Sequence, residues 1–282
     1  MRLLLKSIIA CIVVMSTFSP TARSIDVFVS LAAGDGSHFG KIDLSTYNFT
    51  DIPSLITGPY GSLAWSDSLS KFYMSQDQGN YLTTIDTSGN YGAQITGGTG
   101  RVMLGIAYDN TNSTLYGTRN VSPITYGTIN TSTSAYTSSG STTLSVPGQA
   151  QTSGRLTLMN NTAYLSVGVS GSGGLYSSSI GTAAKTLIGS NALYDDMTLA
   201  SDGTTLYGLR SSTSSAIQIY SIDTSNAALT LLGTSNLGAG RNLIGAAIPT
   251  VPVPEPSTYA LASIASGVMA AVARRRRAKP VK

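Results

Sequence analysis

The sequence predicts an all-β fold, a five-bladed β-propeller whose last blade is built from the two ends of the folded body. Three observations support this prediction. A strand pattern at residues 196–223 occurs repeatedly along the chain, the copies follow one another at the spacing of propeller blades, and the last copy lacks strands that residues 27–43 can supply.

The clearest copy of the pattern reads as a short apolar strand at residues 197–199, a turn at Asp202-Gly203, a strand around Leu206-Tyr207 and a strand ending at Asp223. Three earlier copies share these features. They are Leu63-Ala64-Trp65 followed by Phe72-Tyr73 and Ile85-Asp86; Ile106-Ala107-Tyr108 followed by Leu115-Tyr116 and Ile129-Asn130; and Leu156-Thr157-Leu158 followed by Ala163-Tyr164 and Leu175-Tyr176.

The spacing of the copies matches one blade per copy. Five equivalent positions in the first strands, at Trp65, Tyr108, Leu158, Leu199 and Ala247, are 43, 50, 41 and 48 residues apart. A four-stranded propeller blade repeats every 40 to 50 residues or so. Five first strands therefore predict five blades.

The fifth first strand, residues 243–248, ends at Pro249 and has no partner after it. Residues 27–30 and 39–43 fit the missing later strands, so we expect the two ends of the body to share one blade. Such closure removes the open sheet edges that promote association. The alternatives are a β-sandwich or an open stack of hairpins, because short strands and glycine-rich turns also occur there.

Residues 1–24 have the features of a secretory signal peptide. Arg2 and Lys6 precede an apolar run at residues 7–18, and Ala22-Arg23-Ser24 resembles a cleavage site. An uncleaved anchor is the weaker alternative, because the run is shorter than the roughly 20 residues that span a bilayer. The single cysteine, Cys11, lies in this segment, so the exported body is predicted to contain no disulfide.

The body, residues 25–249, is predicted to be mildly acidic. Up to Thr250 it holds eight Lys and Arg against twelve Asp, a net charge of −4, because the other basic residues lie near the two ends. This charge argues against a nucleic-acid partner. Serine and threonine make up about a quarter of the chain, and we expect the low-complexity stretches 131–143 and 170–179 to be long loops.

The composition changes after Pro249. Residues 250–258 form a proline-rich linker, and residues 259–273 are uncharged and apolar enough for a short transmembrane helix of about 22 Å. Arg274, Arg275, Arg276 and Arg277 follow at once. The positive-inside rule predicts that these arginines and the rest of the tail, residues 274–282, lie in the cytoplasm and the body outside.

The order of these features resembles the PEP-CTERM sorting signal of bacterial exported proteins. The resemblance rests on Val253, Pro254, Glu255, Pro256, Ser257 and Thr258, then the short helix and the arginine cluster, and covers about the last thirty residues. It implies recognition by an exosortase-type membrane enzyme, transient residence in the inner membrane, and release to the cell surface or extracellular matrix, often beside exopolysaccharide production. One departure is a helix richer in small residues than is usual.

The body offers few residues for catalysis. Glu255 is the only glutamate of the chain, His38 the only histidine, and Asp195-Asp196 the only adjacent acidic pair. We expect His38 to lie in a solvent-facing turn, the two aspartates in a turn, and the glycines of residues 34–40 and 171–174 in turns rather than phosphate-binding loops. The sequence therefore predicts no catalytic residue, cofactor or resident metal.

Aromatic residues fall into two predicted groups. Trp65 and the repeated tyrosines Tyr73, Tyr116, Tyr164 and Tyr207 are expected in the core. Another group near predicted loops could stack on sugars. It comprises Tyr47, Tyr60, Tyr91, Tyr136 and Tyr194.

These observations predict a non-enzymatic exported surface or matrix protein, with extracellular polysaccharide as a partner to be tested. The alternative is an exported hydrolase or lyase that uses aspartates, with or without calcium, around the propeller axis. The isolated aspartates Asp35, Asp77, Asp109 and Asp202 could each contribute to such a site, although no spacing resembles an EF-hand loop. Convergence of several aspartates at one mouth of the ring would favour the alternative.

Overall fold

The computed structural model describes residues 25–34, 36–53, 60–76, 81–96, 103–119, 124–141, 151–169, 172–213 and 215–250. All of them belong to one compact unit, Ser24–Thr250. The predicted signal peptide, the sorting motif, the predicted helix 259–273 and the basic tail lie outside the described residues.

The described residues form five antiparallel sheets of four strands each. We call these sheets blades one to five. Blade one is β4(Tyr60–Ser66), β5(Lys71–Gln76), β6(Tyr81–Ile85) and β7(Ile95–Thr96); blade two is β8(Met103–Asp109), β9(Thr114–Arg119), β10(Thr125–Ile129) and β11(Tyr136–Ser141). Blade three is β12(Gln151–Met159), β13(Thr162–Val169), β14(Ser172–Ser179) and β15(Thr186–Ser190); blade four is β16(Thr198–Ser201), β17(Leu206–Thr213), β18(Ala216–Ile222) and β19(Leu229–Asn236). Blade five is β20(Asn242–Ala247), β1(Asp26–Ala33), β2(Gly36–Asp43) and β3(Phe49–Ile52), and a short 3₁₀ turn, η1(Ala192–Tyr194), precedes β16.

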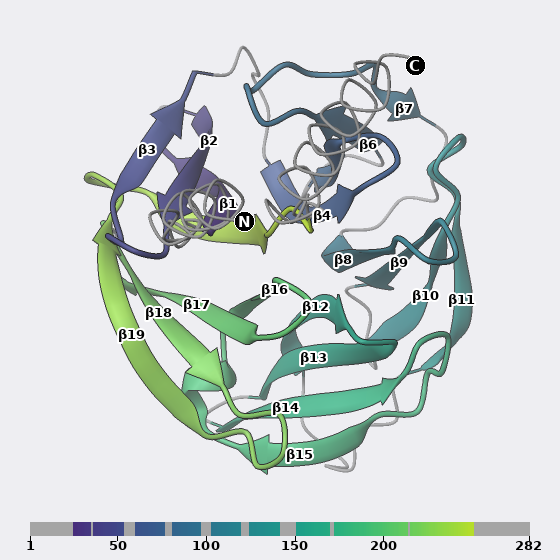
Figure 1. The fold of residues 1–282 in the computed structure, drawn as a ribbon. Coiled ribbons are helices and arrows are strands. Elements are labelled where there is room, and N and C mark those ends of the chain that lie inside the picture. The colour runs from purple at the N-terminus through teal and green to yellow at the C-terminus, as the bar shows by residue number, and fades with distance from the viewer. Residues whose placement is uncertain are drawn as a thin grey trace, which may run out of the picture. The chain divides into compact units, whose positions relative to one another are not determined.

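The five blades close into a ring around a central axis (Figure 1). The first strand of each blade, β4, β8, β12, β16 or β20, is the innermost strand and contacts the innermost strands of both neighbouring blades. The five first-strand positions predicted from the repeat all lie in these strands. The five-bladed propeller is therefore confirmed, and the sandwich and stacked-hairpin alternatives are wrong.

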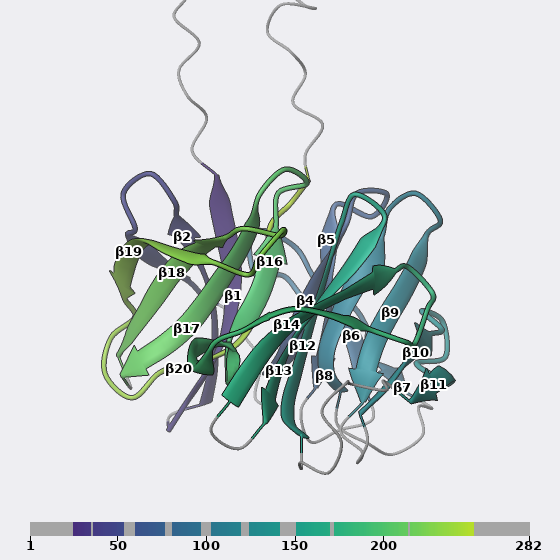
Figure 2. The same cartoon turned by 90° about the horizontal axis from the view of Figure 1, so that it is seen from below.

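Blade five joins the two ends of the body as predicted. β1 pairs with β20, with Phe28 opposite Ala247, and with β2 on its other side. Because β1 begins beside the end of β20, the first and last described residues, Ile25 and Thr250, lie at the same face of the ring. In Figure 2, β1 begins at the upper edge of the ring. We call this face the terminal face.

The core lies between blades rather than inside any one of them. Among the residues that the structure describes, buried apolar side chains form five clusters, and each cluster joins a different pair of neighbouring blades. Alternate residues of a strand point to opposite sheet faces, and both faces are covered here, so strands such as β1 are buried along most of their length. For example, the ring centroids of Phe28 and Phe72 lie 4.9 Å apart across the junction of blades five and one.

A side-chain hydrogen bond also crosses each of the five junctions near the inner strands. Two of these bonds end on the Leu104 carbonyl, which lies at a β-bulge of β8 and is left free by the irregular pairing there. The five bonds are Ser30 Oγ to Gly61 O (2.6 Å), Ser62 Oγ to Leu104 O (2.8 Å), Arg155 Nη1 to Leu104 O (2.9 Å), Ser166 Oγ to Met197 O, and Leu243 N to Ser211 Oγ (3.2 Å).

The prediction that stretches 131–143 and 170–179 are loops is wrong for residues 136–141 and 172–179, whereas residues 131–135 lie in a turn, as predicted. Residues 136–141 form β11 and residues 172–179 form β14. Gly173 lies in β14 rather than in a turn. This position requires glycine, because an added Cβ would come within 2.4 Å of the Asp195 backbone nitrogen. Small residues in this strand thus permit close packing against the η1 turn.

A buried lysine links blades two and three at the periphery. Lys185, only 5% exposed, places its Nζ 3.7 Å from the centre of the Tyr126 ring and donates to Ser178 Oγ and Thr182 O. Burial lowers the pKa of Lys185 to about 8 from its ordinary value of 10.5, and burial raises the pKa of Tyr126.

This lysine predicts a defined pH dependence of stability. Between pH 8 and 10.5 the unfolded chain keeps the Lys185 proton and the folded chain has lost it, so stability rises with pH in this window. We expect the free energy of unfolding of the wild type, relative to Lys185→Met, to increase between pH 7 and pH 9.5. Urea titrations of both proteins measure it, and a constant or falling difference contradicts the assignment.

No helix among the described residues is long and apolar enough to cross a membrane.

Candidate functional site

The inner strands surround a cavity of about 90 Å³ at the terminal face. Every blade contributes to its lining, through β4, β8, β12, β16 and the end of β20. The lining residues include two aromatic residues, Trp65 and Tyr108, and the polar residues Asn110, Thr157 and Ser201. The cavity therefore combines apolar surface with hydrogen-bonding groups, although it is smaller than the roughly 300–1,000 Å³ of most ligand pockets.

The rim of this cavity is fixed by bonds to Asp67. Its Oδ1 accepts from Trp65 Nε1 at 2.6 Å and from Thr250 Oγ1 at 2.9 Å. Its backbone nitrogen donates to Asn110 Oδ1 at 2.7 Å, which joins blades one and two. Asp67 thus holds the indole ring, the last described residue and the next blade in one arrangement.

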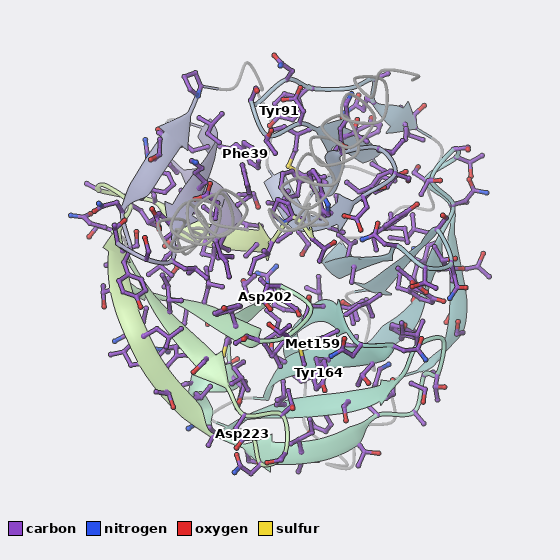
Figure 3. All side chains as sticks on the ribbon, viewed as in Figure 1. Phe39, Tyr91, Met159, Tyr164, Asp202 and Asp223 are labelled. Atoms are coloured by element: carbon purple, nitrogen blue, oxygen red, sulfur yellow. The ribbon has the colours of Figure 1, made fainter. Side chains whose placement is uncertain are left out.

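The other aspartates of the terminal face anchor tight turns. Asp109, only 6% exposed, accepts from the backbone nitrogens of Thr111 and Asn112, and Asp202 accepts from those of Thr204 and Thr205. Asp202 lies near the axis and Asp223, which anchors a turn of the same kind, lies at the periphery (Figure 3).

These hydrogen bonds set the charge of the turn aspartates. Burial raises the pKa of Asp202, but bonds from Thr205, Thr204 and Tyr207 outweigh burial and keep the pKa below its ordinary value. Bonds from the Ser225 hydroxyl and N–H lower the pKa of Asp223 in the same way. Both carboxylates are ionised at neutral pH and serve as acceptors, not as proton donors.

The remaining acidic candidates do not converge. Asp195 and Asp196 lie in a turn, as predicted, and Asp196 has a positive φ of 65°. Among the described residues, no group of three or more His, Cys, Asp and Glu side chains could hold a metal ion. Asp35 and Asp77 lie outside the described residues.

The prediction that His38 lies in a turn is wrong. It lies in β2 opposite Leu31, and its side chain is 20% exposed. Its Nδ1 is 3.4 Å from Asp51 Oδ2, which also receives Arg241 Nη2 at 2.8 Å. The guanidinium therefore balances the Asp51 charge, and the three side chains tie the loop before β20 to the outer strand β3.

The repeated tyrosines Tyr73, Tyr116, Tyr164 and Tyr207 are buried, with exposures of 6–9%, as predicted. Tyr194 lies in the connection between β15 and β16, near a loop as predicted, but it is fully buried and donates to Ala227 O at 2.9 Å, so the expectation that it could stack on a sugar is wrong. Tyr136 lies in β11 and donates to Thr125 Oγ1 at 3.1 Å.

Trp65 was expected in the core. Its ring does pack against Phe72, with centroids 4.8 Å apart, but it also lines the axial cavity. The pairing of an aromatic residue with a polar one two positions later, Trp65 with Asp67 and Tyr108 with Asn110, was the sequence signal for this site.

Outside the propeller, the family described as the PEP-CTERM protein-sorting motif matches residues 252–277. This chain carries a PEP-CTERM sorting signal. The match includes Val253, Pro254, Glu255, Pro256, Ser257 and Thr258 and reaches Arg277. The PEP-CTERM signal implies an exported protein that passes through the membrane and is processed by exosortase, a membrane enzyme.

Similar solved structures share the fold of the body. One is titled a nidogen/laminin complex, with 15% identity, a TM-score of 0.50, and coverage of 78% of this chain and 84% of that one. Another is an engineered GH43 glycoside hydrolase, with 13% identity, a TM-score of 0.55, and coverage of 74% and 50%. A third, a protein of unknown function from Bacteroides thetaiotaomicron, has 13% identity, a TM-score of 0.50, and coverage of 79% and 62%.

No curated protein matches this chain in sequence. Because all three structures are less than 25% identical to it, they support the propeller fold and leave its activity open.

Proposed function

We propose that this protein is a non-enzymatic component of the cell surface or extracellular matrix, delivered there through its PEP-CTERM signal and associated with extracellular polysaccharide. The observation that carries the proposal is the signal itself at residues 252–277. Processing by exosortase, a membrane enzyme, fits a body that is exported before it reaches the surface or matrix.

The composition of the body supports the non-enzymatic part of the proposal. Glu255 lies in the sorting signal, which leaves the body without glutamate, and His38 is its only imidazole. Acid–base catalysis by paired glutamates or by several histidines is therefore excluded. Aspartates remain, and Asp109, Asp202 and Asp223 serve as acceptors in their own turns.

A hydrolase or lyase that uses aspartates is the alternative. The GH43 glycoside hydrolase shares the fold at 13% identity, which gives no support for shared chemistry. Glycosidases need two carboxyl groups that face the same bond. Asp109 and Asp202 instead hold separate turns, so the alternative has no specific observation in its favour.

In the proposed route, the apolar residues 259–273 pause in the inner membrane, and Arg274, Arg275, Arg276 and Arg277 stay on the cytoplasmic side. The prolines around Glu255 keep the preceding segment extended, which suits an enzyme active site. Exosortase then separates the body from the helix.

Cell fractionation of the native host tests the delivery. We expect wild-type protein in the surface or matrix fraction, and Glu255→Ala in the inner membrane, because the motif is no longer processed. His38→Ala is the matched control and should fractionate as the wild type does. Wild-type protein that stays entirely in the inner membrane contradicts the proposal, and a hydrolytic activity lost in His38→Ala contradicts its non-enzymatic part.

A further inference from the structure

The axial cavity at the terminal face has the chemistry of a carbohydrate subsite. Trp65 and Tyr108 line it and are both partly exposed, and none of the lining residues that the structure describes is charged. Sugars present a C–H face that packs on aromatic rings and hydroxyl groups that need hydrogen-bond partners. An aromatic pair beside amide and hydroxyl groups meets both needs.

The polar groups of the cavity are held in place. Ser201, 8% exposed, accepts a bond from Gly203 N at 3.0 Å through its Oγ, which leaves its hydroxyl proton to donate. Asn110 is fixed by the Asp67 nitrogen and keeps its amide N–H₂ as a donor group. The indole of Trp65 is held by Asp67 and Phe72. Rings and polar groups that are already held in place in the free protein lose little conformational entropy when a ligand binds.

The charge of the rim selects among sugars. Asp67, Asp109 and Asp202 stand at the ends of the inner strands, and no lysine or arginine of the described residues lines the cavity. This arrangement repels uronates and sulfated sugars, so it favours a neutral chain. A volume of about 90 Å³ admits part of one sugar ring, which fits the end of a chain better than an internal segment.

We propose that the axial cavity binds the terminal residue of a neutral polysaccharide, with Tyr108 and Trp65 packing on the sugar ring and Asn110, Thr157 and Ser201 bonding its hydroxyl groups. This inference rests on the proposed matrix function and adds the place and class of the ligand to it.

Binding measurements with mature protein from the native host test this site. The probes are the neutral and acidic fractions of the host's own protein-free matrix polysaccharide, separated by anion exchange and immobilised. We expect wild type to bind the neutral fraction more tightly than the acidic one. Tyr108→Ala, which removes a ring, and Thr157→Phe, which fills the cavity, should each weaken binding roughly ten-fold or more. Tyr81→Ala removes an exposed ring at the start of β6, on the opposite face, and should bind as wild type does.

Thermal unfolding of each variant is followed by circular dichroism. If Tyr108→Ala melts below the wild-type temperature, Tyr108→Leu replaces it, and if Thr157→Phe does so, Thr157→Met replaces it. Binding that both cavity variants leave unchanged, or that favours the acidic fraction, overturns the site while the matrix function stands. Absence of wild-type binding to either fraction overturns the polysaccharide partner of the proposed function as well.

Discussion

Deletion of residues 25–52 is expected to abolish the folded monomer. These residues supply β1, β2 and β3, so the deletion leaves β20 alone in blade five. Val27, Val29 and Leu31 leave the cluster shared with blade four, and Phe28 and Phe39 leave the cluster shared with blade one. The deletion therefore removes three strands of one blade and members of two interblade clusters, a large loss for a domain that is stable by only roughly 5–15 kcal/mol.

The measurement combines light scattering after size exclusion with a thermal melt. We expect aggregates or fragments and no cooperative transition, because the edge of β20 and the apolar faces of β4 and β17 are uncovered. Deletion of residues 257–282 is the matched control and should leave the melt of the body unchanged. A monomer that lacks residues 25–52 and melts at the wild-type temperature contradicts the composite blade.

Substitution of Gly245 by alanine is expected to destabilise the ring at its closing junction. An added Cβ would lie 2.7 Å from Gly61 O and 2.8 Å from both Ser30 Oγ and the Ser62 Cα. Two of these atoms belong to the backbone and cannot rotate away, so β20 and β4 must separate. Overpacking of this kind costs about 1–3 kcal/mol, which lowers the melting temperature of a domain of this size by several degrees.

Gly34→Ala provides the matched control, because nothing lies within 4 Å of an added Cβ there. Differential scanning calorimetry should give a melting temperature for Gly34→Ala close to that of wild type and a lower one for Gly245→Ala. Equal melting temperatures for the two variants would mean that the junction of blades five and one is looser than its contacts indicate.

The inner two strands of each blade could be predicted from sequence because they carry the strongest pattern. Repeated apolar and tyrosine positions are buried between blades, and their spacing alone gave the number of blades. β3 escaped prediction, since its two apolar residues, Phe49 and Ile52, are only partly buried and do not alternate with the two exposed polar residues between them.

The outer strands had a signal that hydrophobic periodicity does not detect. Thr137, Thr186 and Thr230 each precede a glycine by three residues, and each motif lies in a fourth strand at a β-bulge. The glycines permit close contact with a turn of the next blade. An added Cβ would meet Ala183 at Gly140, Asn226 at Gly189 and Tyr47 at Gly233.

The turns of the terminal face also repeat in sequence. A four-residue motif begins at Ile42, Ile85, Ile129 and Ile222. It consists of isoleucine, then Asp or Asn, then any residue, then serine. In each copy the serine N–H donates to the Asp or Asn side chain. The cavity itself could not be predicted, because it needs residues from five strands that are brought together only when the ring closes.

The mass of the protein at the cell surface tests the central claim most directly. If the PEP-CTERM signal at residues 252–277 directs processing and release, surface protein from the native host ends near Pro256 and lacks Arg274, Arg275, Arg276 and Arg277. Intact-mass spectrometry with C-terminal peptide sequencing resolves this end. A surface protein whose mass corresponds to a chain that ends at Lys282 would contradict the account, since residues 252–277 would then act only as an anchor.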